Sequence, residues 1–320
     1  MLLRITHETN LSYSDLINET VMELHMCPRQ EQDQHRLSFE LSIGPATTVS
    51  SYFDWLGNTV HAFTINSFHR ELRIAATSVL ETERTFGDPL KSNDPIPRDA
   101  GGDYTNYDYL QLTGPIVDSP QLRNLAESLQ LGPHLPCGEA AGRMLAAIHE
   151  RFIYEKGITT VASPITEVLE HGRGVCQDFT HLMIGLARVA RIPARYASGF
   201  LHSGDADLRG ATESHAWCEL QFPTLGWIGF DPTNNCVAGE NFVKLAVGRH
   251  YSDVPPHRGL FKGIAVETME VTVKSEELRM IPAHLAAERV RSLPVQTYGG
   301  WREISPEGLR LVEEMHQQQQ

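Results

Sequence analysis

The stretch Gly172-Arg173-Gly174-Val175-Cys176-Gln177-Asp178-Phe179 places two glycines shortly before a cysteine and an apolar helical period directly after it. The period continues at spacings of three and four through Leu182, Met183, Leu186 and Ala190. It predicts a helix that begins near Cys176 and ends before Pro193. At a helix N-terminus, unpaired backbone N–H groups and the positive end of the helix dipole favour a thiolate and can hold an oxyanion. The stretch therefore predicts a nucleophilic thiol with part of an oxyanion hole beside it.

A nucleophilic thiol needs a base close by, and histidine is the economical choice. His215 begins the alternating segment His215-Ala216-Trp217-Cys218-Glu219-Leu220, which predicts a strand. A tight turn over residues 223–226 brings the next predicted strand back to Asp231. In an antiparallel pair the start of the first strand lies opposite the end of the second, so we expect His215 and Asp231 to be neighbours. A carboxylate beside an imidazole fixes its tautomer and stabilises its charged form.

Each of these three residues also has a simpler interpretation. Taken alone, a cysteine at a helix start is more often a small buried residue than a nucleophile. A histidine on a strand is usually a hydrogen-bonded structural group, and Asp-Pro most often opens a turn. Their joint occurrence, in one chain order and with hairpin geometry, favours Cys176, His215 and Asp231 as a catalytic triad.

Three further residues are candidates for substrate binding. Gln177 either donates a hydrogen bond to the oxyanion or is solvated, and Trp217 either shields the imidazole or forms part of the substrate wall. Tyr109 belongs to a group of tyrosines that either lines a cleft or packs with its hydroxyl in water. Asp178 is expected to cap the predicted helix, and His181 is expected to pack, because it lies nearly a turn and a half beyond Cys176.

The rest of the chain divides into regions of different pattern. Residues 1–85 contain short alternating runs rich in β-branched and aromatic residues, which predict a β-sandwich or barrel without chemistry of its own. Residues 86–138 form a connecting region dense in proline, glycine and aspartate. Residues 139–275, with helices first and strands after, predict an α+β catalytic core whose antiparallel sheet ends with a strand over 264–274. Residues 276–320 are expected to form a peripheral, helical and polar tail.

Composition narrows the class of protein. The 320 residues include 27 Lys and Arg against 40 Asp and Glu, and this net charge of −13 argues against nucleic acid as a partner. The apolar stretches are shorter than the roughly 20 residues that span a bilayer, and the N-terminus lacks a leader pattern, so we expect a cytoplasmic protein without a membrane partner. Five cysteines without CxxC spacing argue against a disulfide framework and a thiolate zinc site. Asp205-Ala206-Asp207 lacks the glycine and the distal glutamate of a calcium loop, so we expect neither a metal nor a cofactor.

Three segments resemble motifs of the bacterial transglutaminase-like superfamily. Gly172–Phe179 resembles the nucleophile motif, Glu213–Trp217 the histidine motif, and Gly229–Asn234 the aspartate motif, within a match of about residues 140–275. Phe53–Asn58 is similar to part of the N-terminal domain that accompanies this core in many bacterial members.

The resemblance implies a papain-like α+β fold and thiol chemistry on amides through an acyl-enzyme, with Cys176, His215 and Asp231 in the triad roles. The expected function is a cysteine-dependent amide hydrolase, a protease or peptidase acting on a peptide or protein amide, since water needs no dedicated second site. Transfer of the acyl group to an amine is the alternative within catalysis. Gln177 stands where animal transglutaminases have tryptophan, which weakens a direct analogy with cross-linking enzymes. A non-catalytic binding module on the same scaffold is the alternative outside catalysis.

Overall fold

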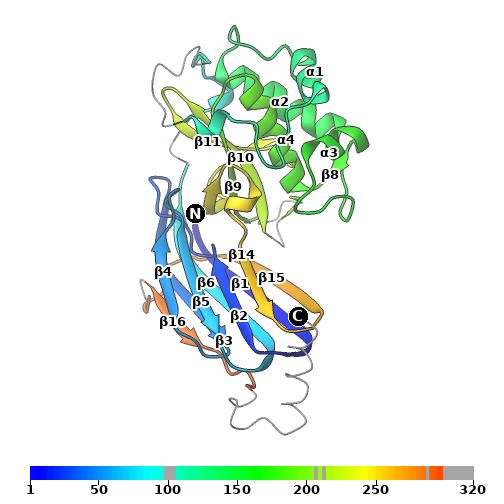
Figure 1. Ribbon diagram of the computed structural model, residues 1–320. Coiled ribbons are helices and arrows are strands. Elements are labelled where there is room, and N and C mark those ends of the chain that lie inside the picture. Colours follow the sequence, from blue (N-terminus) through cyan, green and yellow to red (C-terminus); the bar gives the residue numbers. More distant parts are fainter. Residues whose placement is uncertain (85, 97–105, 205–207, 211–213, 286–287, 298–320) are drawn as a thin grey trace. The chain divides into compact units, whose positions relative to one another are not determined.

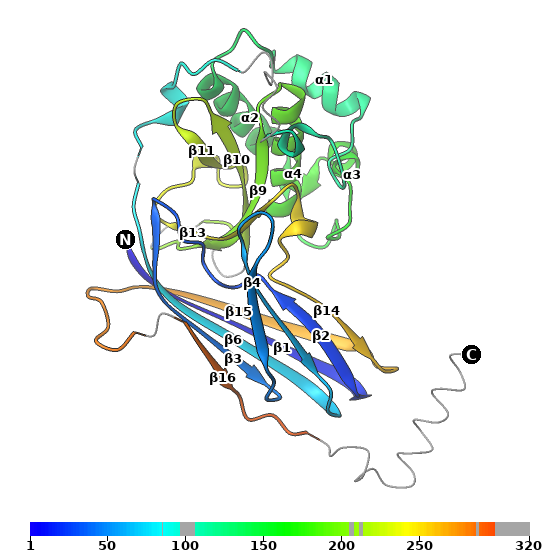
Figure 2. The ribbon, with the colours of Figure 1, turned by 60° about the vertical axis from the view of Figure 1, so that its left-hand side comes forward.

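The computed structural model describes residues 1–84, 86–96, 106–204, 208–210, 214–285 and 288–297. The chain forms two compact units (Figures 1 and 2). The core unit comprises Met1, residues 28–35 and residues 81–256. The β unit comprises residues 2–27, residues 36–80 and the described part of residues 257–320. Both units are thus assembled from segments that are separate in the sequence.

The β unit consists of two sheets whose facing side chains share one hydrophobic core. The first sheet has the order β15-β1-β6-β3-β16 and the second the order β14-β2-β5-β4. Their bounds are β1 Leu2–Ile17, β2 Glu19–Leu24, β3 Gln34–Gly44, β4 Val49–Phe53, β5 Thr59–Ile65, β6 His69–Thr82, β14 His257–Lys262, β15 Glu267–Glu277 and β16 Arg289–Ser292. Residues of both sheets meet in the core, among them Leu11, Met22, Phe39, Phe63 and Leu72. The all-β region expected at the N-terminus is confirmed, because alternation along these strands buries one face of each sheet.

The strand expected over residues 264–274 has a different partner from the one predicted. The sequence pattern predicts it in the sheet of the catalytic core, but as β15 it pairs antiparallel with β1, from Leu3 opposite Glu277 to Tyr13 opposite Glu267. The preceding strand β14 pairs with β2, so the chain has returned to the β unit by residue 257. An alternating pattern indicates a strand but not its partner, which is why the boundary predicted at residue 275 lies too late.

The helical tail predicted from residue 276 also differs from the structure. Glu276 and Glu277 still belong to β15, and β16 runs parallel to β3, with Arg289 opposite Glu40 and Ser292 opposite Ile43. The rest of that prediction, from residue 298 onward, lies outside the described residues.

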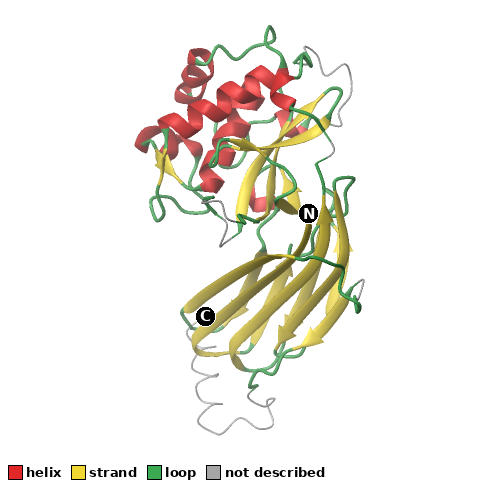
Figure 3. Ribbon diagram, turned by 180° about the vertical axis from the view of Figure 1, so that it is seen from behind, coloured by secondary structure: helices red, strands yellow, loops and turns green. Residues whose placement is uncertain are grey.

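The core unit is an α+β domain, as predicted. Its sheet has the order β12-β11-β10-β9-β13, and a short parallel pair, β7 with β8, lies beside the helices. Figure 3 shows the helices gathered in this unit. The bounds are α1 Pro120–Ser128, α2 Cys137–Arg151, β7 Ile153–Tyr154, α3 Ile165–His171, β8 Arg173–Gly174, α4 Cys176–Val189, β9 Ala194–Leu201, β10 His215–Phe222, β11 Gly226–Asp231, β12 Cys236–Val237 and β13 Phe242–Gly248, with 3-10 turns η1 Pro89–Lys91, η2 Asp108–Leu110 and η3 Tyr251–Asp253. Among the helices of the described residues, none has the length and apolar character that a membrane crossing requires.

The supposed connecting region 86–138 is part of this domain and not a linker. It contains α1, whose N-terminus is capped by Ser119, the hydroxyl of which accepts a hydrogen bond from the Leu122 N–H at 3.2 Å. Ile96, Ile116 and Leu122 are buried in the same hydrophobic core as α2 and α4. The pair Ser119-Pro120 is a helix-start signal that could have revealed α1 from sequence.

Strand β10 has two distinct faces, as its alternation predicts. Ala216, Cys218 and Leu220 are buried in the core that contains the apolar face of α4. On the other face Trp217 packs in a separate cluster with residues such as Phe242. The domain thus packs α4, which begins at Cys176, against the middle strand of the sheet, β10, which begins at His215.

Candidate active site

Cys176 is the first residue of α4, which confirms the predicted helix start. The preceding Val175 is extended, and its N–H donates to Asp178 Oδ2 at 2.8 Å. The Thr159 hydroxyl donates to the same oxygen at 2.6 Å. Asp178 therefore caps the helix, as expected from sequence. Gly174 leaves room for this carboxylate, because a Cβ at residue 174 would lie 2.7 Å from it. Cys176 itself is half-buried at the end of the helix where backbone N–H groups are unpaired.

The expected proximity of His215 and Asp231 is confirmed. His215 Nε2 lies 2.7 Å from Asp231 Oδ2, and neither side chain is exposed to solvent. The pair forms because β10 and β11 are antiparallel and joined by a tight turn, with Cys218 opposite Phe230 and Phe222 opposite Gly226. Asp231 Oδ1 accepts further hydrogen bonds, from the backbone N–H of Thr233 at 2.9 Å among others. The carboxylate is therefore held on both oxygens.

The environment of His215 favours its protonated form. Burial alone lowers the pKa of the imidazole, but the charge and hydrogen bond of Asp231, together with the sulfur of Cys176, raise it to about 10. Since Nε2 faces Asp231, Nδ1 is the ring nitrogen that remains for proton exchange with the thiol. Nδ1 makes no hydrogen bond within the described part of the chain. In cysteine enzymes the hydrogen bond between the imidazole and the thiol often forms fully only when substrate binds. The raised pKa of His215 suits a thiolate beside an imidazolium.

Alkylation is expected to distinguish Cys176 from the other cysteines. Burial raises the pKa of the Cys27, Cys137 and Cys236 thiols to about 12 and that of Cys218 well above its ordinary value. At about pH 6, iodoacetamide should therefore modify Cys176 at least about tenfold faster than any of them. Peptide mass spectrometry over a time course measures these rates. Equal modification of a second cysteine in the folded protein would contradict the assignment of Cys176 as the reactive thiol.

Trp217 lies against His215 but is itself almost fully buried, with 1% of its surface exposed. Its ring stacks on the imidazole at 6.4 Å between centroids and meets Phe242 edge-on at 5.3 Å. Of the two interpretations weighed from sequence, shielding of the imidazole agrees with this burial. The Gln177 side chain donates to the Val161 carbonyl at 3.2 Å, so in this conformation its amide is engaged with a neighbouring loop.

Tyr109 lies in η2, and its described contacts are at the other end of β10. Its ring meets Trp227 edge-on at 5.0 Å, and a hydrogen bond joins its hydroxyl to Arg195. Arg195 is opposite Glu219 in the sheet, whereas His215 is opposite Gly199. The contacts that the structure describes therefore associate Tyr109 with Glu219 and not with His215. The neighbouring Tyr104, considered with it from sequence, lies outside the described residues.

His181 has a structural role, as predicted. Its Nε2 accepts a hydrogen bond from the Tyr251 backbone N–H at 3.1 Å. Burial lowers the pKa of His181 to about 3, so the ring is neutral and occupied by this bond.

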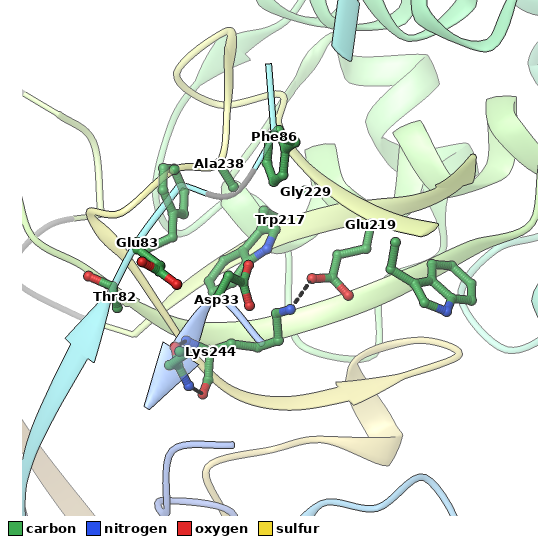
Figure 4. Close-up of a pocket in the computed structure, with 13 residues that line it drawn as sticks. Asp33, Thr82, Glu83, Phe86, Trp217, Glu219, Gly229, Ala238 and Lys244 are labelled. Carbon is green, nitrogen blue, oxygen red and sulfur yellow. Dashed lines mark hydrogen bonds and ion pairs between the residues drawn. The ribbon is translucent and has the colours of Figure 1, made fainter. Parts of the chain in front are cut away.

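Sequence reasoning missed a buried ion-pair cluster on the Trp217 face of the sheet (Figure 4). Glu219 binds Arg195 at 2.7 Å and Lys244 at 2.5 Å, and Lys244 also binds Glu31 at 2.6 Å. Burial raises the pKa of Glu219, but Arg195 and Lys244 lower it by more, so the net shift is downward to about 2 and the carboxylate is charged. The cluster borders a pocket whose lining also includes Asp33, Trp217 and Gly229.

Comparisons with known proteins agree with this architecture. Residues 3–81 match the bacterial transglutaminase-like N-terminal region, and residues 123–232 match the transglutaminase-like superfamily. An uncharacterized protein of Mycobacterium leprae is 30% identical over 296 residues, which cover 86% of this chain and 99% of that protein. The chain therefore belongs to the transglutaminase-like superfamily and carries the bacterial N-terminal region of that family.

Two further matches describe the neighbourhood within the family. A solved structure of a "putative cysteine protease" from Cytophaga hutchinsonii has a TM-score of 0.67 and 22% identity, and it covers 90% of this chain and 95% of that one. It supports the fold of both units. A protein-glutamine gamma-glutamyltransferase of Pseudomonas aeruginosa is 31% identical over 137 residues, which are 40% of this chain and 20% of that enzyme.

Proposed function

We propose that this protein is a cysteine-dependent amide hydrolase that acts on a peptide or protein amide through a thioester acyl-enzyme. The observation that carries the proposal is the buried pair of His215 with Asp231, together with Cys176 at the start of α4, whose sulfur contributes to the raised pKa of the imidazole. This order of thiol, imidazole and carboxylate is the arrangement by which cysteine enzymes activate a nucleophile.

In the proposed reaction the Cys176 thiolate attacks the amide carbonyl carbon, and a carbon–sulfur bond forms. The negative charge moves to the carbonyl oxygen, where N–H groups at the start of α4 can stabilise it. The His215 imidazolium donates its proton to the leaving amine as the carbon–nitrogen bond breaks. Water then attacks the thioester carbon, and His215 accepts a proton from that water. The carbon–sulfur bond breaks, the acid product departs, and Cys176 remains as a thiolate.

Acyl transfer to an amine is a second candidate, because part of the chain is 31% identical to a protein-glutamine gamma-glutamyltransferase. The two reactions share the thioester and differ only in the second nucleophile. Since no disulfide joins any of the five cysteines, all of which lie in the described residues, we also propose a reducing location such as the cytoplasm, which fractionation of the native cells would test.

One partitioning experiment separates the two reactions. The protein is incubated with a glutamine-containing peptide pool and a labelled primary amine, and the products are read by mass spectrometry. We expect acid products, from water, to exceed labelled amides by at least about tenfold, because no second binding site is needed for water. A majority of labelled amides would replace hydrolysis with acyl transfer as the function.

A further inference from the structure

The Asn234 side chain makes three hydrogen bonds close to the triad. Its Nδ2 donates to Asp231 Oδ2 at 2.7 Å and to the Arg209 carbonyl at 3.1 Å. Its Oδ1 accepts a hydrogen bond from the Arg209 N–H at 3.0 Å. A carboxamide has two N–H donors and one acceptor oxygen, so this one group joins the triad carboxylate to the backbone of residue 209.

Two donors converge on the same oxygen of Asp231. His215 Nε2 and Asn234 Nδ2 each lie 2.7 Å from Oδ2, while Oδ1 accepts from the backbone of Thr233 and Asn234. The direction in which Oδ2 faces the imidazole is therefore set by Asn234 as well as by the backbone. In a buried site such a bond has few competitors, because the Asp231 side chain is not exposed to water.

The segment 208–210 lies directly against the imidazole. Gly210 has φ +87°, and a Cβ built on it would lie 2.4 Å from His215 Nδ1. Only glycine adopts this backbone conformation readily and leaves room for the ring. Gly210 thus bounds the Nδ1 side of His215, the side that remains for Cys176.

The two other residues of this segment contact both sides of the site. Leu208 packs against the apolar cluster that contains Trp217. The Arg209 guanidinium lies over the Tyr154 ring, 5.5 Å from its centroid, and Tyr154 is opposite Gly174 in the β7–β8 pair. Gly174 is two residues before the nucleophile, so the segment extends from the histidine side to the cysteine side.

We propose that Asn234 is a positioning residue, whose carboxamide holds the Asp231 carboxylate and the segment 208–210 in one arrangement around His215. The inference rests on the proposed function, since it assigns the transferred proton to His215. Without the carboxamide, Asp231 Oδ2 loses one of the two side-chain donors that the described residues give it, and the segment loses its two hydrogen bonds with Asn234.

The test follows the alkylation of Cys176 by iodoacetamide from about pH 5 to about pH 9, which requires no substrate. Asn234→Ala removes the carboxamide. Gly210→Ala leaves Asn234 and Asp231 intact but forces the segment away from the imidazole. Asn235→Gly is the matched control, because Asn235 is an exposed neighbouring asparagine with φ 51°, a conformation that glycine adopts easily.

Both test variants should lose about tenfold in alkylation rate at about pH 6. Asn235→Gly should keep the wild-type profile. A folded Asn234→Ala protein with the wild-type profile, even at a lower melting temperature, would overturn the inference. If Asn234→Ala does not fold, an unchanged profile for Gly210→Ala overturns it instead. An ordinary thiol profile in the wild-type protein would overturn the proposed function itself.

Discussion

Replacing Cys176 with alanine should reduce amide hydrolysis by about 10⁴-fold or more, because the variant lacks the atom that forms the thioester. The fold should be retained, since the side chain is small and half-buried at the start of α4. The measurement is the rate of acid formation from a cleaved peptide substrate, with circular dichroism and thermal unfolding to verify the fold. The same variant should form no acyl adduct in a mass spectrum of the intact protein.

Cys218→Ala is the matched control for this experiment. Cys218 is fully buried on the helix-facing side of β10, and its thiol pKa lies well above the ordinary value. This variant should lose some stability, through a small cavity, but should retain activity. Hydrolysis that survived in Cys176→Ala at the wild-type rate would exclude the thioester mechanism.

Asp231→Asn should lower kcat by about 10³-fold while the fold remains. The asparagine keeps the shape of the side chain but removes its charge. Burial then dominates and lowers the pKa of His215, which the carboxylate now helps to raise to about 10. In the variant, the His215 imidazolium that stabilises the thiolate therefore loses its proton at a lower pH than in the wild-type protein. The alkylation rate of Cys176 at about pH 6 should therefore fall together with kcat.

The sign of the stability effect follows from the same shift. The pKa of His215 is raised in the folded state. The contribution of this residue to the free energy of unfolding is therefore fully present below about pH 6.5 and is lost as the pH rises toward about 10. Asp231→Asn removes this dependence. Asp253→Asn is a suitable control, because it likewise removes the charge of a largely buried carboxylate, one that pairs with Arg249. An Asp231→Asn protein with wild-type kcat and an unchanged alkylation profile would exclude a role for this carboxylate.

The sequence alone predicted those features that depend on residues close together in the chain. The start of α4 at Cys176 follows from an apolar period and preceding glycines, which act within a few residues. The meeting of His215 with Asp231 follows from a tight turn, because so short a connection fixes which strand ends are adjacent. Trp217 and Cys218 lie on opposite faces of β10 for the same reason, since side chains alternate along any strand.

Features that join distant segments were decided only when the chain folded. Strand β15 pairs with β1 across more than 250 residues, and alternation specifies a face without specifying a partner. Tyr109 lies beside Trp227, and Glu219 beside Lys244, because sheet register and packing choose among many compatible neighbours. Asn234 ends the segment that resembles the aspartate motif, but its bonds to Arg209 and Asp231 depend on where the segment 208–210 lies, which the sequence does not indicate. Short-range geometry is encoded by adjacent residues, whereas long-range contacts are selected by the free energy of the whole packed domain.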